Sequence, residues 1–293
     1  EFLPATYLLP NELQMFEQKY DEYRSDENSN NFWILKPIAR FGGAGISIVT
    51  KKSQVSQHAK ERSRYAQSRD QSIISKYVDN PFLIGGKKFD LRLYVLVTSY
   101  KPLRAYVYHH GFARFSAYKY SNDLKNINDK SIHLTNTTLQ KTAKAYNDSH
   151  GMKWSYQNML ALIEATRGKE AKDKLIADID FIFLHTLKSC QNIMYNDKHC
   201  FEMYGYDVML DDNLKPWLIE VNASPSLAAT TTADRVLKYN LMNDTFKIVL
   251  RTDTEAPYGE YKFTQLNEDE MGDYRILISE PFENTARSYD RRR

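Results

Sequence analysis

The pattern of apolar and polar residues changes twice along the chain and divides it into three segments. Residues 1–75 contain short apolar runs around a glycine cluster, which predicts a small α+β lobe, with 1–31 as the remnant of a further N-terminal region. Residues 76–250 first alternate with a period of two and then take helical spacing, which predicts antiparallel hairpins and packed helices. Beyond residue 250 the hydrophobic pattern thins and arginines accumulate, so 251–293 is expected to be a charged, poorly ordered tail.

The same pattern locates the individual elements. Strands are expected over residues 31–38, 46–49, 73–78, 89–95 and 103–108, and a last hairpin over 201–222 with its turn at 211–213. Helices are expected over 51–70, ending in a mobile connection, and over 153–165, 169–194 and 232–242, with 121–150 mostly loop. The predicted fold class is α+β with mainly antiparallel sheets.

Composition narrows the class of protein. The chain has 293 residues, of which 42% are hydrophobic and 26% are charged, as in ordinary folded proteins. No stretch approaches the roughly 20 apolar residues that cross a membrane. The two cysteines, Cys190 and Cys200, are too few for a disulfide framework and favour a reducing compartment. Because the first residue is Glu1 and no signal peptide opens the chain, we expect the natural start to lie upstream.

The net charge bears on the class of partner. It is only +3, from 40 basic and 37 acidic residues, which argues against a general nucleic-acid binder. A local basic face for an acidic protein remains compatible with this balance.

The last hairpin carries the residues best suited to hold a metal ion. Side chains alternate between the faces of a strand, so Glu220 and Asn222 share one face. A turn centred between residues 212 and 213 would bring Asp207 diagonal to Glu220, so that three oxygen donors meet, as Mg²⁺ requires when phosphate oxygens complete its octahedron. A solvated face with ordinary acids is the alternative. The residues expected to face the core are Trp217, Ile219 and Val221.

A second polar face lies on the strand that begins near residue 88. Lys88, Asp90 and Arg92 alternate with apolar residues, so they could present a cation to a phosphate and an arginine fork to an acyl phosphate or carboxylate. A ladder of weak cross-strand ion pairs explains this row equally well. Arg114, between two aromatic residues, is equally compatible with ligand binding and with snorkelling.

Two turns add candidate phosphate contacts. Backbone N–H groups of the glycine turn 42–45 could approach a phosphate, with Lys36 on the preceding strand, although a plain tight turn is the simpler explanation. Residues 133–136 form a polar turn for which a helix cap is the simpler explanation. The seven histidines lack zinc-site spacing and no nucleophile elbow occurs, which argues against hydrolases and metalloproteases.

These segments occur together in one order and resemble the tubulin–tyrosine ligase-like family of ATP-grasp ligases. The resemblance covers nearly all of the chain as far as about residue 250. Within the family, the chain looks most like the catalytic subunit of a multisubunit tubulin polyglutamylase. The segments that carry the family resemblance are Lys36-Pro37 with the glycine turn, Lys76-Tyr77, Lys88 to Arg92, His133 to Asn136 and Trp217 to Ser226. The segments that carry the closer likeness to the polyglutamylase subunit are Phe2 to Pro10, Asn80 to Val97, Asn196 to Glu202 and Leu237 to Thr245.

The resemblance implies an ATP-grasp fold whose two lobes clamp ATP and Mg²⁺. It implies that a glutamate side chain of a tubulin C-terminal tail receives the γ-phosphoryl group and that the amine of free L-glutamate attacks the resulting acyl phosphate. The implied catalytic residues are Arg92 and Arg114, the implied amino-acid site is Arg114, Thr138 and Lys153, and the implied metal ligands are Asp207, Glu220 and Asn222. The implied nucleotide contacts are Lys36, Gly42, Gly43, Ser75, Lys76, Tyr77, Val78, Lys88, Asp90, Thr135 and Asn136.

The resemblance also implies a setting. Accessory subunits of a polyglutamylase complex would target the enzyme to microtubules in the cytoplasm and cytoskeleton, at the axoneme or basal body of a cilium or flagellum. Neither nucleic acid nor membrane is expected as a partner.

Two departures from the family pattern leave alternatives open. The family's glycine turn usually reads Gln-Gly-Lys-Gly, whereas this chain has Ala44 in place of the lysine, and Ser75 stands where many relatives have glutamine. We therefore expect nucleotide binding to survive more readily than full activity. The alternatives are a ligase of glycine or tyrosine, and a catalytically inactive ATP-grasp scaffold that binds microtubules.

Overall fold

The structure is a computed structural model that describes residues 1–25, 30–38, 42–63, 71–146, 152–197, 200–250 and 270–281. Contacts group the chain into two compact units: the first holds residues 1–92, 111–178 and 206–220, and the second holds 93–110, 179–205 and 221–293. Four elements pass from one unit to the other: β5 (Phe89–Tyr100), α6 (Lys169–Cys190), β9 (Glu202–Leu210) and β10 (Pro216–Asn222).

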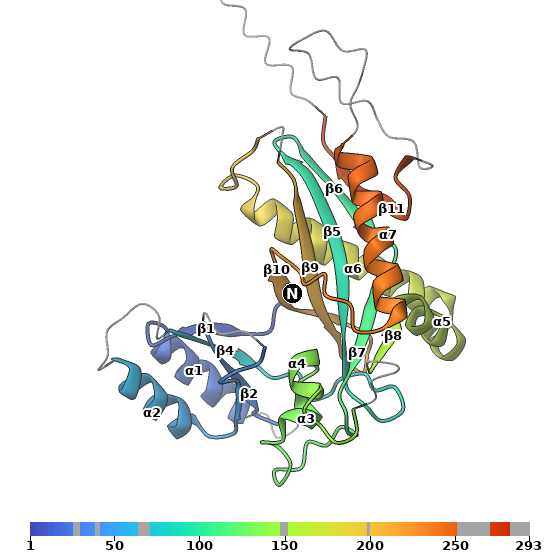
Figure 1. The fold of residues 1–293 in the computed structure, drawn as a ribbon. Coiled ribbons are helices and arrows are strands. Elements are labelled where there is room, and N and C mark those ends of the chain that lie inside the picture. The colour runs from blue at the N-terminus through green and yellow to red at the C-terminus, as the bar shows by residue number, and fades with distance from the viewer. Residues whose placement is uncertain are drawn as a thin grey trace, which may run out of the picture. The chain divides into compact units, whose positions relative to one another are not determined.

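The first unit contains a four-stranded antiparallel sheet with two helices packed on one face (Figure 1). Its strand order is β1 (Thr6–Leu9), β4 (Ser72–Lys76), β2 (Trp33–Pro37) and β3 (Ser47–Val49). The helices are α1 (Leu13–Arg24) and α2 (Lys52–Ser63).

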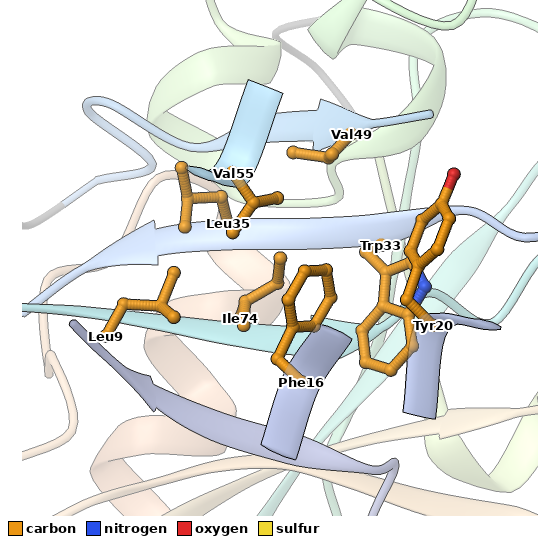
Figure 2. Packing of buried hydrophobic residues seen from close by; sticks show 8 residues of the cluster. All are labelled: Leu9, Phe16, Tyr20, Trp33, Leu35, Val49, Val55 and Ile74. Carbon is orange, nitrogen blue, oxygen red and sulfur yellow. The ribbon is translucent and has the colours of Figure 1, made fainter. Parts of the chain in front are cut away.

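Alternation along β2 separates the core face of this sheet from the face that carries polar candidates. Trp33 and Leu35 are buried beneath the helices, and Phe16 of α1 lies edge-on to Trp33 with ring centroids 5.0 Å apart (Figure 2). Ile34 and Lys36 alternate with them and so point to the opposite face. There Ile34 packs against a second apolar cluster, formed by Phe32, Ile48, Tyr77 and Ile127.

The first unit also holds a second group of paired strands. The beginning of β5 pairs with β7 (Phe112–Phe115), and β7 pairs with β8 (Lys153–Ser155), both antiparallel. Helix α5 (Tyr156–Arg167) follows β8 directly, capped by the Ser155 hydroxyl. Two short helices, α3 (Lys130–His133) and α4 (Thr137–Gln140), begin at the caps Asp129 and Asn136.

The second unit is built on the remainder of β5. This part of β5 pairs with β6 (Leu103–Tyr108), and β6 pairs with β11 (Tyr274–Ser279). The hydrogen-bonded order of the strands is β10-β9-β5-β6-β11, with β7 and β8 branching from β5. Helix α7 (Thr232–Val249) contributes two residues to the core of this unit. That core is formed by Tyr94, Leu96, Tyr106, Tyr108, Leu241, Ile248, Met271 and Tyr274.

The structure confirms the α+β class with antiparallel sheets, and it adds elements that the pattern did not predict. Helix α1 occupies residues expected as an N-terminal remnant, and its buried Phe16 and Tyr20 lie four residues apart, the spacing of one helix face. Residues 153–155 pair with β7 instead of starting the helix, which begins at Tyr156. The expected helix over 51–70 is described as far as Ser63, and 64–70 lie outside the described residues.

The structure differs from two further expectations, which concern the core-facing residues of β10 and the centre of the turn before it. Val221 was expected in the core but is 41% exposed, whereas Leu218, on the alternate face of β10, is buried. The hydrogen bond from the Asp211 N–H to the Lys215 carbonyl centres the turn on residue 213, one half-residue beyond the expected centre. The faces of β10 are therefore not divided as the simple alternation predicts.

The tail and the domain boundary complete the comparison. Within the expected tail, Tyr274–Ser279 form β11 because alternate apolar residues pair with β6; 251–269 and 282–293 lie outside the described residues. The expected boundary at residue 75 falls within β4. Among the described helices, none is long and apolar enough to span a membrane.

Candidate active site

The centre of the candidate site is a cluster of buried ion pairs in the first unit. Arg92 on β5 donates to Asp207 on β9, from Nε to Oδ1 at 2.5 Å and from Nη2 to Oδ2 at 3.0 Å. Arg114 on β7 places Nη2 2.9 Å from Oδ2 of Asp207 and donates from Nε to Oδ1 of Asp90 at 2.9 Å. The four side chains are 6–14% exposed. Four of the site residues predicted from the sequence, which come from β5, β7 and β9, are therefore in contact through ion pairs.

Strand register explains part of this meeting. Asp90 and Arg114 stand directly opposite each other in the β5–β7 pair, so their side chains share a face. Arg92 lies two residues along β5 and faces the same way. The cross-strand ion pairs considered from the sequence are therefore present, but they are buried and bidentate.

Burial and opposite charge act against each other in this cluster. Burial raises the pKa of the Asp207 carboxyl, but the guanidinium groups of Arg114 and Arg92 outweigh it and hold that pKa well below its usual range. Burial lowers the pKa of Arg114, but Asp90 and Asp207 outweigh it and raise that pKa. Arg114 and Asp207 therefore remain ionised at neutral pH.

Lys153 extends the cluster across one more strand. It is the Cα partner of Arg114 in the β7–β8 pair, so these two predicted amino-acid-binding residues are cross-strand neighbours. The Lys153 ammonium also lies 5.0 Å from the centroid of the Phe112 ring. Thr138 lies elsewhere, beside the glycine turn, where its Cγ2 would be 3.6 Å from a Cβ on Gly42. Its part in an amino-acid site stays a prediction.

Lys88 is a buried cation that is held by an aromatic hydroxyl. The residue is 1% exposed, and its ammonium donates to the Tyr77 hydroxyl at 2.7 Å and lies 4.2 Å from the centroid of the same ring. The Tyr77 hydroxyl is also 2.9 Å from Nδ1 of His133, and Nε2 of His133 is 3.1 Å from the Asn126 carbonyl oxygen. The turn motif pointed to this segment, but sequence reasoning chose Thr135 and Asn136 and missed the His133 side chain.

A second lysine, Lys36, interacts electrostatically with Lys88 and with the carboxylates of the ion-pair cluster. Burial lowers the pKa of Lys36, and the carboxylates of Glu220, Asp207 and Asp90 raise it in opposition. Burial and the charge of Lys36 together lower the pKa of Lys88 to about 7, although the carboxylates of Asp90 and Asp79 raise it in opposition. Two desolvated ammonium groups that repel each other favour the binding of an anion, because an anion replaces the solvation that burial removed.

The glycine turn borders a cavity that both predicted phosphate-binding segments line. Gly42 and Gly43 have φ of +67° and +78°, and a Cβ on Gly43 would collide with Leu139 of α4. The cavity has a volume of about 360 Å³. Its lining comprises residues 45–48, 127, 128, 130, 133 and 134. The turn and the His133 segment are therefore neighbours in space.

The segment predicted to contact the adenine also has structural bonds. The Ser75 hydroxyl accepts a hydrogen bond from the Thr6 hydroxyl at 2.9 Å. The Lys76 ammonium donates to the backbone carbonyls of Asn30, at 2.6 Å, and Phe32, at 3.3 Å. These side chains hold β4 in the sheet, so a nucleotide contact from this segment would come mainly from its backbone.

The remaining predicted nucleotide contacts differ in their surroundings. Asn136 accepts the backbone N–H of Thr138 at 2.9 Å and caps α4, so the helix-cap explanation is correct for this residue. Its side-chain nitrogen is not used by that bond. Thr135 is buried, and Val78, just after β4, is partly exposed.

Among the described contacts, none joins the three predicted metal ligands, Asp207, Glu220 and Asn222, to one another. Asp207 is buried among arginines, Glu220 is exposed, and Asn222 belongs to the second unit, where its amide donates to the Gly205 carbonyl at 3.1 Å. In the described part of the chain, no three His, Cys, Asp or Glu side chains are close enough to hold a metal ion. Asp207 and Glu220 fit a hard cation chemically, because they are oxygen donors that both act on Lys36.

Comparison with known proteins gives a consistent result. The chain is 40% identical over 284 residues to the probable alpha-tubulin polyglutamylase Ttll1 of Tetrahymena thermophila, covering 96% of this chain and 68% of the relative. It is 41% identical over 284 residues to the probable tubulin polyglutamylase ttll-9 of Caenorhabditis elegans, covering 96% and 64%. It is 39% identical over 279 residues to the probable tubulin polyglutamylase TTLL9 of Bos taurus, covering 85% and 59%.

The chain thus spans about two thirds of the length of these relatives. Residues 1–257 match the tubulin-tyrosine ligase family, a range that includes every residue of the site described above. On this match and these identities, the chain belongs to the tubulin-tyrosine ligase family.

Proposed function

We propose that this chain is the ligase portion of a tubulin polyglutamylase with an ATP-grasp fold. Its reaction would join free L-glutamate to glutamate side chains of tubulin C-terminal tails at the expense of ATP. The relatives named above are probable polyglutamylases, which favours glutamate over the glycine or tyrosine that the sequence left open.

One observation carries the proposal: two desolvated lysines lie in the field of the buried carboxylate–arginine cluster. Lys88 and Lys36 repel each other, and the carboxylates of Asp90, Asp207 and Glu220 act on Lys36. A site with this charge pattern suits a polyphosphate, because the lysines attract it while the carboxylates provide oxygen donors for the accompanying cation. A purely structural cluster has no need of two desolvated lysines beside it.

The proposed chemistry divides among the residues by charge. Lys88 and Lys36 bind phosphate oxygens, and the backbone of the glycine turn approaches them from the neighbouring cavity wall. Arg92, held in place by Asp207, stabilises the charge that develops on the transferred phosphoryl group and on the tetrahedral intermediate. Mg²⁺, when held by Asp207 and Glu220, would supply further neutralisation of the phosphates.

The amino-acid substrate would lie beside the same cluster. Arg114 and Lys153 can bind its carboxylates from adjacent strands, which orients the amine toward the acyl phosphate. The amine nitrogen forms the new amide bond, and the phosphate leaves with the electrons of the acyl–oxygen bond and takes up the proton that the amine loses. No side chain forms a covalent intermediate. Positioning and charge neutralisation provide the catalysis.

Partners and location form the outer part of the proposal. Acidic tubulin tails are the expected substrate, and accessory subunits of a polyglutamylase complex are expected to target the enzyme to microtubules of the cytoskeleton and of cilia or flagella. Attraction between basic residues and the tails would weaken as salt rises.

The test measures incorporation of labelled glutamate, glycine and tyrosine into microtubules with Mg-ATP. It uses the full-length protein with its co-purifying partners, a Glu220→Gln variant and a control, Glu170→Gln, which neutralises an exposed acid on α6. We expect glutamate alone to be incorporated, by the parent and the control but not by Glu220→Gln. Incorporation of glycine or tyrosine would overturn the proposed substrate. ATP binding without any product would favour the inactive scaffold.

A further inference from the structure

The Tyr77 hydroxyl links a lysine of the proposed nucleotide site to a histidine. It makes hydrogen bonds with Nζ of Lys88 at 2.7 Å and with Nδ1 of His133 at 2.9 Å, and it also interacts with the Tyr120 hydroxyl. Tyr77, Lys88 and His133 are all buried. The chain of contacts ends at the Asn126 carbonyl, 3.1 Å from Nε2 of His133.

Elementary hydrogen-bond chemistry assigns every proton in the series of hydrogen bonds from Lys88 to Asn126. A carbonyl oxygen can only accept, so Nε2 of His133 must carry a proton. In a neutral imidazole Nδ1 is then an acceptor, and the Tyr77 hydroxyl donates to it. With its single proton committed, the Tyr77 oxygen presents lone pairs to Lys88, whose ammonium can only donate.

The surroundings keep His133 neutral. Burial and the charge of Lys88 together lower the pKa of His133 to about 4, although the Asn126 carbonyl and Asp129 raise it in opposition. Near neutral pH the ring therefore stays an acceptor toward Tyr77.

The other groups around Lys88 do not replace this acceptor. Asp90 and Asp79 attract its charge and Lys36 repels it, and the Tyr120 ring lies 5.9 Å from its ammonium. The Tyr120 hydroxyl donates to the Asp79 backbone carbonyl at 2.8 Å. Tyr77 is thus the one described hydrogen-bond acceptor of the Lys88 ammonium.

We propose that His133 is a positioning residue of the nucleotide site: by accepting the Tyr77 proton, it fixes the Tyr77 oxygen as an acceptor that orients Lys88 toward a phosphate. The inference rests on the proposed function in taking Lys88 as a phosphate contact. His133 also lines the cavity beside the glycine turn, so its ring connects the wall of that cavity to the lysine.

The main experiment measures the Kd of Mg-ATP by calorimetry between pH 6 and 9, using the full-length protein, His133→Leu, Tyr77→Phe and the double variant. Binding should weaken above about pH 7, where Lys88 loses its proton before nucleotide arrives. Loss of the acceptor should make Lys88 harder to protonate. We therefore expect each single variant to bind about tenfold more weakly at pH 8.5 and nearly normally at pH 6, the effect of about one unit in the pKa of Lys88.

The double variant separates positioning from simple loss of packing. If His133 acts through the Tyr77 hydroxyl, His133→Leu adds nothing to the pH dependence in the Tyr77→Phe background. A loss of affinity that is equal at all pH values, or additive in the double variant, would overturn the proposal. Lys88→Arg serves as the matched control, because arginine stays charged and should remove the fall in affinity above pH 7.

A second measurement needs no substitution that could prevent folding. Nitrogen-15 NMR of the unaltered protein reports which imidazole nitrogen carries the proton, and the His133 signal can be assigned by its contacts with the Tyr77 ring. We expect the Nε2–H form at pH 7; a proton on Nδ1 would overturn the proposal. Neither readout depends on ligation, so failure to incorporate glutamate would contradict the proposed function and leave the role of His133 standing.

Discussion

At the scale of single residues, the site depends on buried charges. Burial removes their solvation, which costs free energy, and charged neighbours offset that cost. Asp207 accepts hydrogen bonds from two arginines, and its side chain is 6% exposed. Its removal would leave both guanidinium groups without their shared anion. Arg114 would keep Asp90, but Arg92 would lose its described carboxylate partner, and leaving a buried charge in this way costs several times as much as losing a surface ion pair.

Asp207→Asn tests this difference. We expect it to lower the free energy of unfolding by about 3 kcal/mol, because an amide cannot neutralise Arg92 and Arg114. Chemical denaturation at pH 7 measures the change. The matched control, Asp212→Asn, removes an exposed charge from the same hairpin and keeps the oxygen that accepts from Asn80, so it should change stability by less than about 0.5 kcal/mol. Equal midpoints for the two variants would contradict the buried-pair account.

At the scale of elements, the glycine turn and β11 depend on different physical causes: backbone conformation for the turn, and burial of a side chain in the core for the strand. The turn needs glycine at residue 43, both for its positive φ and for the space occupied by Leu139. Ala44, in contrast, is exposed, so this position accepts a larger side chain. Strand β11 lies far along the sequence but supplies Tyr274, which is 3% exposed, to the core of the second unit.

Ala44→Lys should add the cation that the family resemblance leads us to expect in this turn. We expect Mg-ATP to bind about tenfold more tightly at low salt, the equivalent of about 1.4 kcal/mol for one added phosphate contact. Calorimetry at two salt concentrations measures the gain and its screening. Ala44→Gln has a long polar side chain without the charge and should show no such gain. A lysine with no effect would place this turn away from the phosphates.

Strand β11 can be tested with two substitutions on one strand. Tyr274→Ala should destabilise the protein by about 3 kcal/mol, because it removes a buried ring and the hydrogen bond of its hydroxyl with Thr245, 2.8 Å long. Ile276→Ala, at a position 37% exposed, should cost much less. The measurement is again the denaturation midpoint. Equal, small effects would mean that this segment behaves as the tail expected from the sequence.

At the scale of the whole molecule, buried titratable groups make stability depend on pH. The folded pKa of His133, about 4, lies below its ordinary value of 6.5, and that of Lys88, about 7, lies below 10.5. In both windows the unfolded chain binds more protons than the folded chain. Stability should therefore rise with pH from about 4 to 6.5, and again from about 7 to 10.5.

Denaturation across pH 4 to 10 measures these two windows. The slope that each group contributes is at most about 1.4 kcal/mol per pH unit. Lys88→Met should reduce the rise above pH 7, to which Lys36 also contributes, and leave the rise below pH 6.5, whereas His133→Gln should reduce the lower one. A parent protein whose stability is flat above pH 7 would show that Lys88 keeps an ordinary pKa. Saturating Mg-ATP should flatten the upper window, because a bound phosphate favours the charged lysine.

Local patterns were sufficient for much of the fold. The alternation around residues 89–95 predicted β5, the apolar run before the glycine turn predicted β2, and helical spacing predicted α5, α6 and α7. These elements depend on neighbours in the sequence, since each presents one apolar face or stripe. Helix α1 and β11 were missed, because segments of mixed composition acquire their structure from the core that covers them.

The candidate site divides in the same way. Sequence alone determined which residues could do the chemistry: the row Lys88, Asp90 and Arg92, the turn glycines, and the acids of the last hairpin. Only the tertiary structure decided that Asp207 is shared by two arginines and that Tyr77 joins Lys88 to His133. Those partners are separated by 11 to 115 residues in the sequence, and their charges and protons are set by burial, which a sequence pattern does not measure.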